Sequence, residues 1–256
     1  LDVLAARPGV GKTSLALNMA QAAAKAGHKV LFFSLEMTKE ELGMRLLAAA
    51  AEVPARKMRS GNLDPGKTYA HIADKGSELY KLPFSIIDEA KMTSTEIWAI
   101  CRREKALRGL DFVVIDYLQR IKDRLKNRAR YEEVSQIVQN LKSMAKELRI
   151  PVLVTAQLGR GIEGRQRKEP MLSDLRESGD IEAEADLVMF LHREEIYDPK
   201  PDNMGKAKLI IAKHRQDAVG VIDLIFEKEF TRFRENDSHL RNLPEGWLKR
   251  AAEKGG

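Results

Sequence analysis

The first thirteen residues hold the feature that most constrains the fold. An apolar, strand-like run over residues 1–6 meets a tight turn with Pro8 and Gly9, and Lys12 and Thr13 then open an alanine- and leucine-rich stretch. A strand, a glycine-bearing turn and a helix in this order are typical of a phosphate-binding P-loop. Backbone N–H groups of such a loop point inward, and a helix N-terminus is partly positive. The stretch therefore predicts a polyphosphate site.

The residue types in this turn predict a nucleoside triphosphate bound with Mg²⁺. Lys12 is expected to reach the β- and γ-phosphates, and the Thr13 hydroxyl to bind the metal. Ala6 replaces the first glycine of the motif, whereas Gly9, Gly11, Lys12 and Thr13 keep the expected types. A glycine-bearing turn with a stray lysine is the alternative. The expected nucleotide contacts are Arg7, Pro8, Gly9, Val10, Gly11, Lys12, Thr13 and Ser14.

Strand and helix patterns alternate over residues 1–235, which predicts one α/β domain with a mainly parallel central sheet flanked by helices. Thr38 and Thr93 each begin a capping-box pattern, and Asp64 with Pro65 predicts another helix start. Further strands are expected at 29–35, 83–88, 110–116, 151–156 and 187–191. Strands at 207–213 and 219–226, with a short one near 230–233, predict a C-terminal β-hairpin extension. Residues 236–256 form a polar C-terminal tail in this prediction.

Composition excludes some classes of protein. With 256 residues and 43% hydrophobic content, the chain can bury a substantial core, but no apolar run approaches the roughly 18–20 residues of a membrane span. Cys101 is the single cysteine, so no internal disulfide forms, and we expect a cytoplasmic location. The net charge of +6 favours polyanionic partners. The first residue is not Met and already lies in the first predicted strand, which indicates an N-terminally truncated fragment.

Three further predicted strands end in polar groups suited to nucleotide hydrolysis. Asp116 follows an apolar run and fits the role of a Mg²⁺ ligand, directly or through water. Glu36 is the candidate catalytic base, because a carboxylate at the end of a buried strand would be costly without a function. Gln157 is placed to sense the γ-phosphate. Each has a simpler explanation: a strand boundary for Asp116, a residue beside the Thr38 cap for Glu36, and an ordinary polar residue for Gln157.

The predicted hairpin carries Lys213 and Arg215 at its turn, far along the chain from the P-loop. Phosphoryl transfer often uses an arginine from a neighbouring subunit, worth about 10³–10⁵ in rate. Arg215 is therefore a candidate arginine finger with Lys213 assisting. A solvated basic turn is the alternative.

Two basic segments follow strands that carry catalytic candidates. Residues 120–130 place a basic residue at every second position, and residues 158–168 carry four more. Because few aromatic residues lie in them, contact with nucleic-acid phosphates is expected rather than base stacking. Segment 120–130 could instead be a solvated edge. The residues expected to bind DNA in the first segment are Arg124, Lys126 and Arg128.

The motifs, in their order and combination, resemble those of the DnaB family of hexameric bacterial replicative helicases, within the RecA-like ATPases. The matching stretches are ARPGVGKT (6–13), FSLEM (33–37), VIDYLQ (114–119), TAQL (155–158), LSDLRESGDIE (172–182) and IAKHR (211–215). The family tolerates alanine at the position of Ala6. The stretch at 217–219 departs from the usual turn of the family beside the finger.

The resemblance implies a RecA-like P-loop NTPase that hydrolyses ATP with Mg²⁺ as a homo-hexamer on single-stranded DNA, unwinding duplex in the 5′→3′ direction. It implies that Glu36 is the base, that Arg215 acts in trans beside Lys213, and that Arg176, Glu177 and Gly179 contact the DNA backbone. It also implies primase, helicase-loader and clamp-loader partners and no membrane. The alternatives are a RecA-like recombination or repair ATPase and a P-loop kinase, in which segment 158–168 would form the lid.

Overall fold

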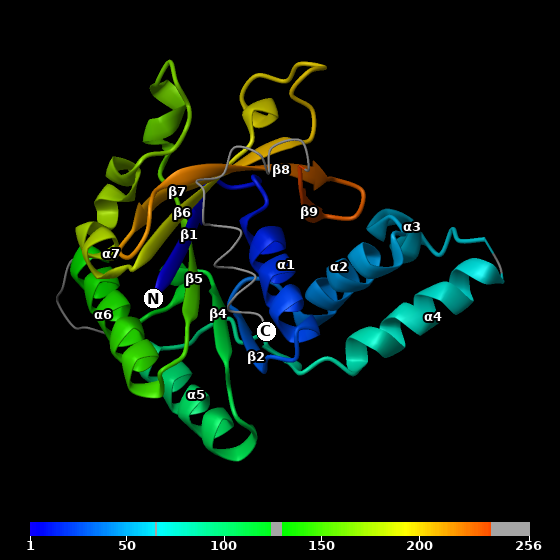
Figure 1. Cartoon of the computed structure of the whole chain (residues 1–256), viewed down its shortest axis with the longest axis horizontal. Coiled ribbons are helices and arrows are strands. Elements are labelled where there is room, and N and C mark those ends of the chain that lie inside the picture. Colours follow the sequence, from blue (N-terminus) through cyan, green and yellow to red (C-terminus); the bar gives the residue numbers. More distant parts are fainter. Residues whose placement is uncertain (65, 124–129, 237–256) are drawn as a thin grey trace.

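The computed structural model describes residues 1–64, 66–123 and 130–236, with backbone alone for 176–180. These residues form one nine-stranded sheet in the order β3-β2-β4-β5-β1-β6-β7-β8-β9 (Figure 1). The first six strands in this order pair in parallel, and the last three pair antiparallel. The predicted α/β class, parallel sheet and C-terminal hairpin are confirmed. The strands are β1 (Asp2–Ala6), β2 (Val30–Ser34), β3 (Phe84–Ile87), β4 (Phe112–Asp116), β5 (Val152–Gln157), β6 (Leu187–His192), β7 (Lys206–His214), β8 (Gly220–Glu227) and β9 (Arg232–Glu235).

Helices cover both faces of the sheet (Figure 1). On one face lie α1 (Lys12–Lys25) and α2 (Lys39–Ala51), from which α3 (Ala55–Ser60) and α4 (Lys67–Tyr80) extend outward. The other face carries α5 (Ser94–Arg108), α6 (Arg130–Leu148) and α7 (Gly179–Glu184). Short 3₁₀ turns are η1 (Leu118–Arg120), η2 (Arg160–Gly164), η3 (Leu172–Ser178) and η4 (Glu194–Ile196). In the part of the chain that the structure describes, no helix has the length and apolar character needed to span a bilayer.

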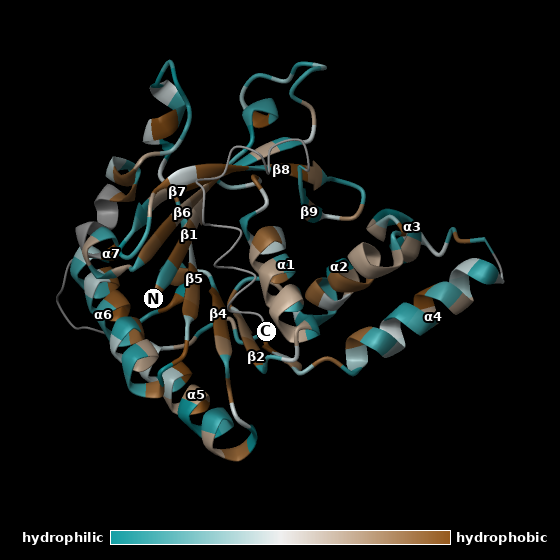
Figure 2. Cartoon of the chain, viewed as in Figure 1, coloured by the Kyte–Doolittle hydropathy of each residue, from teal (hydrophilic) through white to brown (hydrophobic). Residues whose placement is uncertain are grey.

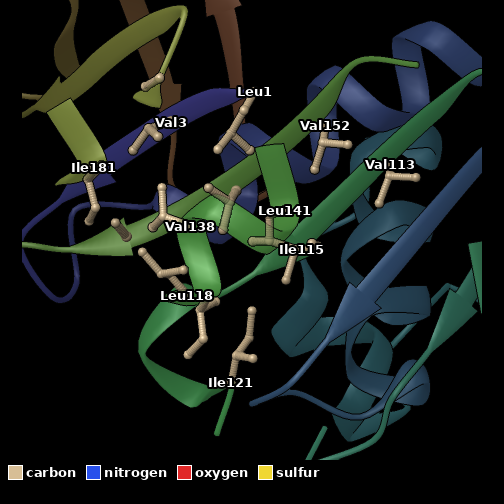
Figure 3. Packing of buried hydrophobic residues seen from close by; sticks show 14 of the residues in the cluster. Leu1, Val3, Val113, Ile115, Leu118, Ile121, Val138, Leu141, Val152 and Ile181 are labelled. Carbon is tan, nitrogen blue, oxygen red and sulfur yellow. The ribbon is translucent and has the colours of Figure 1, made fainter. Parts of the chain in front are cut away.

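Alternate residues of the central strands are buried in two separate hydrophobic cores, one on each face of the sheet. Val113 and Ile115 of β4 belong to the core beneath α5 and α6, whereas Val114 belongs to the core beneath α1 and α2. Successive side chains of a strand point to opposite faces, so a strand covered on both faces is apolar throughout. Figure 2 shows the resulting hydrophobic colour along the central strands, and Figure 3 shows Val138 and Leu141 of α6 packed near Ile115 and Leu118.

Local capping signals set two of the helix starts. Thr38 and Glu41 form the predicted capping box before α2, with each side chain bonded to the other residue's backbone N–H. Thr93 and Glu96 do the same before α5. The predicted Asp64 cap is wrong: α4 begins at Lys67 after Gly66, whose φ of 109° bends the chain there without a side-chain cap. Pro65 and the tail residues 237–256 lie outside the described residues.

Candidate active site

The candidate residues meet at one edge of the sheet. Strands β2, β4, β5 and β1 are consecutive neighbours and run parallel, so their carboxyl ends lie together. A cavity of about 710 Å³ opens at this edge, and its lining includes Lys12, Thr13, Glu36 and Gln157. Open parallel sheets bind ligands at this end of their strands. Residues from these separate strand ends therefore meet around one cavity.

Two glycines give the phosphate loop its shape. Gly9 has φ 77° and Gly11 has φ 109°, a region of backbone conformation that residues with a Cβ rarely adopt. A Cβ on Gly11 would lie 2.9 Å from Cζ of Phe233, whereas one on Gly9 would meet no atom within 4 Å. Ala6 ends β1 and is buried in the core, where its methyl group packs. The loop thus needs glycine at position 11 for two reasons, and alanine at position 6 is accommodated.

Asp116 is almost fully buried, with 1% of its surface exposed, yet it is well supplied with partners. The Thr13 hydroxyl donates to its Oδ2 at 2.6 Å, the Thr155 hydroxyl donates to Oδ1, and Lys12 Nζ lies 3.6 Å from Oδ1. Burial lowers the pKa of Lys12, while the charges of Asp116 and Glu36 oppose this shift. A lysine that is partly desolvated beside a carboxylate and lines a cavity is a candidate functional residue.

The Thr13 and Asp116 oxygens fit a Mg²⁺ ion. Mg²⁺ takes oxygen ligands, and it usually binds through one or two carboxylates together with substrate phosphates and water. Among the described residues, no group of three or more His, Cys, Asp and Glu side chains could hold a metal. The hydroxyl and carboxylate oxygens, 2.6 Å apart, would therefore act with the nucleotide rather than as a complete protein site.

Glu36 is not buried, although the sequence indicates it as the candidate base because it is expected to end a buried strand. Its side chain is 48% exposed, because it follows β2 and faces the open cavity. Arg120 Nη2 lies 3.8 Å from Glu36 Oε1. A solvent-facing carboxylate at the cavity is still able to contact an attacking water, but burial does not single it out.

Sequence reasoning missed a wall of the cavity formed by Arg45, Arg193, Phe226, Lys228 and Thr231. Arg193 Nη1 donates to the Val10 carbonyl at 3.1 Å, and its guanidinium lies 4.0 Å from the Phe226 ring centre. The antiparallel ribbon β8–β9 brings Phe226, Lys228 and Thr231 across the phosphate loop (Figure 1), whereas Arg45 comes from α2. Arg193 comes directly after β6, so a search of every strand end for polar groups would have found it.

Comparison with known proteins agrees with this geometry. The family model described as the DnaB-like helicase C terminal domain matches residues 1–235. The chain belongs to the DnaB-like helicase family. The chain is 46% identical over 239 residues to the replicative DNA helicase DnaC of Bacillus subtilis (strain 168), covering 91% of this chain and 52% of that protein. It is 42% identical over 235 residues to the replicative DNA helicase DnaB of Geobacillus stearothermophilus, covering 91% and 52%.

Solved structures place this DnaB-like domain in the RecA-like class predicted from sequence. One solved structure, described as an ATPase domain, superposes with a TM-score of 0.87 at 37% identity, covering 91% of this chain and 84% of that one. A DnaB-like replicative helicase, described with its interactions with primase, gives the same TM-score and identity but has 58% of its chain covered. The chain spans about half the length of the curated relatives it matches.

In this DnaB-like domain, Arg215 and Lys213 lie near the amino ends of the parallel strands, whereas the phosphate loop lies at their carboxyl ends. His214 pairs with Leu187, which in turn pairs with Asp2 at the start of β1, whereas the loop follows the end of β1. Arg215 Nη2 donates to the Ala183 carbonyl at 2.7 Å, and Lys213 Nζ donates to carbonyls at the end of α7. The structure therefore does not bring these two candidates to the chain's own site.

The predicted DNA-binding residues fall in two groups. Arg124, Lys126 and Arg128 lie outside the described residues. The backbone of Arg176 and Glu177 lies on η3, and Gly179 begins α7, on the side of the sheet that carries α6. The side chains of Arg176 and Glu177 lie outside the described part. In segment 158–168, Arg165 pairs with Asp174 at 2.6 Å and Arg167 pairs with Glu169 at 2.6 Å.

Proposed function

We propose that this domain is the ATP-hydrolysing motor of a replicative DNA helicase, acting in a homo-hexameric ring that moves 5′→3′ on single-stranded DNA. The observation that carries the proposal is the buried carboxylate of Asp116, which accepts from Thr13 and lies beside Lys12, both of which line the cavity. Membership of the DnaB-like family and 46% identity to a replicative helicase support the same function.

Each residue at the cavity has a proposed task in hydrolysis. Backbone N–H groups of the loop, with Lys12, hold the phosphates of ATP. Thr13 and Asp116 would hold Mg²⁺, which would supply positive charge beside the phosphates. Glu36 faces the cavity and accepts a proton from the attacking water. Gln157 lines the same cavity and contacts the γ-phosphate. Arg193, Phe226 and Lys228 line the remaining wall and are suited to the nucleoside.

The position of Arg215 supports a finger acting in trans. β1 is five residues long, so its two ends are separated by four steps of ~3.3 Å, which is roughly 13 Å. An arginine at the far end cannot reach the γ-phosphate of its own subunit. Head-to-tail contact between subunits would bring Arg215 and Lys213 of one chain to the cavity of the next.

DNA contact is assigned to the segments that follow β4 and β5 in the sequence, including Arg124, Lys126 and Arg128, and to Arg176, Glu177 and Gly179. Partner proteins are proposed for the longer protein: a primase, by analogy with the related helicase described with primase, together with a helicase loader and a clamp loader. We also propose a cytoplasmic location.

Mixing two inactive variants tests the shared site. Lys12→Ala and Arg215→Ala are each expected to lose ATPase activity stimulated by single-stranded DNA, and their mixture should regain part of it through hybrid sites. Arg103→Ala, which removes an exposed arginine of α5, is the control and should keep full activity. Stable mixed assemblies without recovery would refute a trans finger. No stimulation of wild-type hydrolysis by DNA would refute the helicase proposal.

A further inference from the structure

At Gln157, the end of β5 has no strand of the described chain paired with it on the side that faces β4. The ladder between β4 and β5 pairs residues 113–115 with 152–154 and goes no further, because the chain turns into η1 after Asp116. On the other side, β1 still pairs with β5 as far as Gln157. The peptide groups of Gln157 that face β4 therefore need another partner, since unpaired backbone groups are costly.

The side chain of Gln119 supplies that partner. Its Nε2 donates to the Gln157 carbonyl at 3.1 Å, and its Oε1 accepts from the Gln157 N–H at 3.1 Å. A primary amide carries a donor and an acceptor side by side, like a peptide group, and only Gln and Asn side chains have one. One orientation of the amide satisfies both bonds. Gln119 thus replaces a missing strand at one residue.

The backbone carbonyl of Gln119 is bonded in turn by Arg130, the last residue of basic segment 120–130. Arg130 Nη2 donates to the Gln119 carbonyl at 2.8 Å, and Arg130 begins α6 at the end of segment 120–130. Gln119 and Gln157 also line a second cavity of about 420 Å³, formed with residues of the 159–175 loop. Gln157 lines the nucleotide cavity as well, so it borders both spaces.

We propose that Gln119 is a positioning residue for Gln157: by holding both polar groups of its backbone, it fixes the direction in which the Gln157 side chain enters the nucleotide cavity. This inference rests on the proposed function, since it assumes that Gln157 contacts the γ-phosphate. In the described part of the chain, Gln119 is not among the residues that line the nucleotide cavity. Its effect is therefore confined to states that contain a γ-phosphate or its mimic.

Binding of ADP alone is compared with binding of ADP plus aluminium fluoride, which mimics the transferring phosphoryl group. Gln119→Met keeps the length of the side chain and removes both hydrogen bonds. It should leave ADP affinity within about 2-fold and weaken the preference for the fluoride complex by about 10-fold. Gln139→Met, on the exposed side of α6, is the matched control and should change neither.

A double-mutant cycle separates positioning from a structural effect. In a Gln157→Ala background, adding Gln119→Met should cause no further loss of preference, because the side chain to be positioned is absent. If Gln119→Met lowers the thermal midpoint strongly, Gln119→Asn, whose shorter stem cannot span both groups, is measured in the same way. An unchanged preference in the single variant, or an equal further loss in the Gln157→Ala background, overturns the inference. Failure of the wild-type chain to bind ADP would instead refute the proposed function, and this inference with it.

Discussion

The close approach of Phe233 to Gly11 predicts that replacing Gly9 and replacing Gly11 by alanine lower the free energy of unfolding by different amounts. Gly9→Ala and Gly11→Ala both place a Cβ on a backbone with positive φ, which costs about 1–2 kcal/mol. At Gly9 nothing lies within 4 Å of the new carbon, so this is the whole effect. At Gly11 the new carbon would lie 2.9 Å from Cζ and 3.0 Å from Cε2 of Phe233.

Phe233 cannot move away easily. It is buried, its ring lies 4.6 Å from that of Phe226, and its backbone N–H donates to Asn18 Oδ1 at 2.8 Å. Forcing an extra methyl group into a packed site costs about 1–3 kcal/mol. When the backbone and packing costs are added, we expect Gly11→Ala to lower the free energy of unfolding by about 2–5 kcal/mol, which is about 1–3 kcal/mol more than Gly9→Ala.

Urea unfolding of the nucleotide-free protein measures the free energy of unfolding of both alanine variants. In a thermal scan, their unfolding midpoints should differ by about 2–4 °C for each kcal/mol of difference. Phe233→Leu removes the atoms nearest to the new Cβ, so combining it with Gly11→Ala should recover most of the extra cost. The same substitution combined with Gly9→Ala should be additive. Equal costs for the two alanines, or no coupling between Gly11→Ala and Phe233→Leu, would refute the steric explanation.

Further outcomes are expected for Lys12, for Cys101 and for DNA binding. Burial lowers the pKa of Lys12, so the midpoint of the fall in nucleotide affinity as pH rises should lie below 10.5, the ordinary lysine pKa; a midpoint at or above 10.5 would contradict this. Burial raises the pKa of the Cys101 thiol from 9.0 to about 12, so a thiol reagent at pH 8 should label unfolded protein only. Because the folded thiol stays neutral while the unfolded one ionises, stability should fall between pH 9 and 12, and Cys101→Ala should reduce that slope. Single-stranded DNA should bind with a steep loss of affinity as salt rises and with little base preference; strong sequence specificity at physiological salt would argue against backbone contact.

Local signals explain what the sequence could predict. Thr38 and Thr93 form their capping boxes with residues three positions away, so a short window of sequence contains the whole interaction. The strand ends that carry Asp116 and Gln157 could be predicted because parallel strands place their carboxyl ends at one edge. The misplaced start of α4 has the same origin, since Asp64 and Pro65 imitate a local cap while the backbone turn at Gly66 sets the start.

The groups that the sequence did not predict meet only through the folded topology. Arg193 reaches the Val10 carbonyl across 183 positions, and Phe233 reaches Gly11 because β8 and β9 fold back over the loop. No periodicity in either segment encodes that crossing. Gln119 is similar: its bonds to Gln157 depend on where β4 ends and turns, which a strand pattern leaves uncertain by a residue or two.

The distance between Arg215 and the phosphate loop of the same chain has a consequence for the free protein. Under the proposed assignment, a solitary chain has a nucleotide pocket and an arginine that cannot meet, because the length of the sheet lies between them. Such a chain would retain ATP without cleaving it. Turnover per chain would then rise with protein concentration and level off once every pocket faces a neighbour, so that unassembled protein consumes little of the cell's ATP.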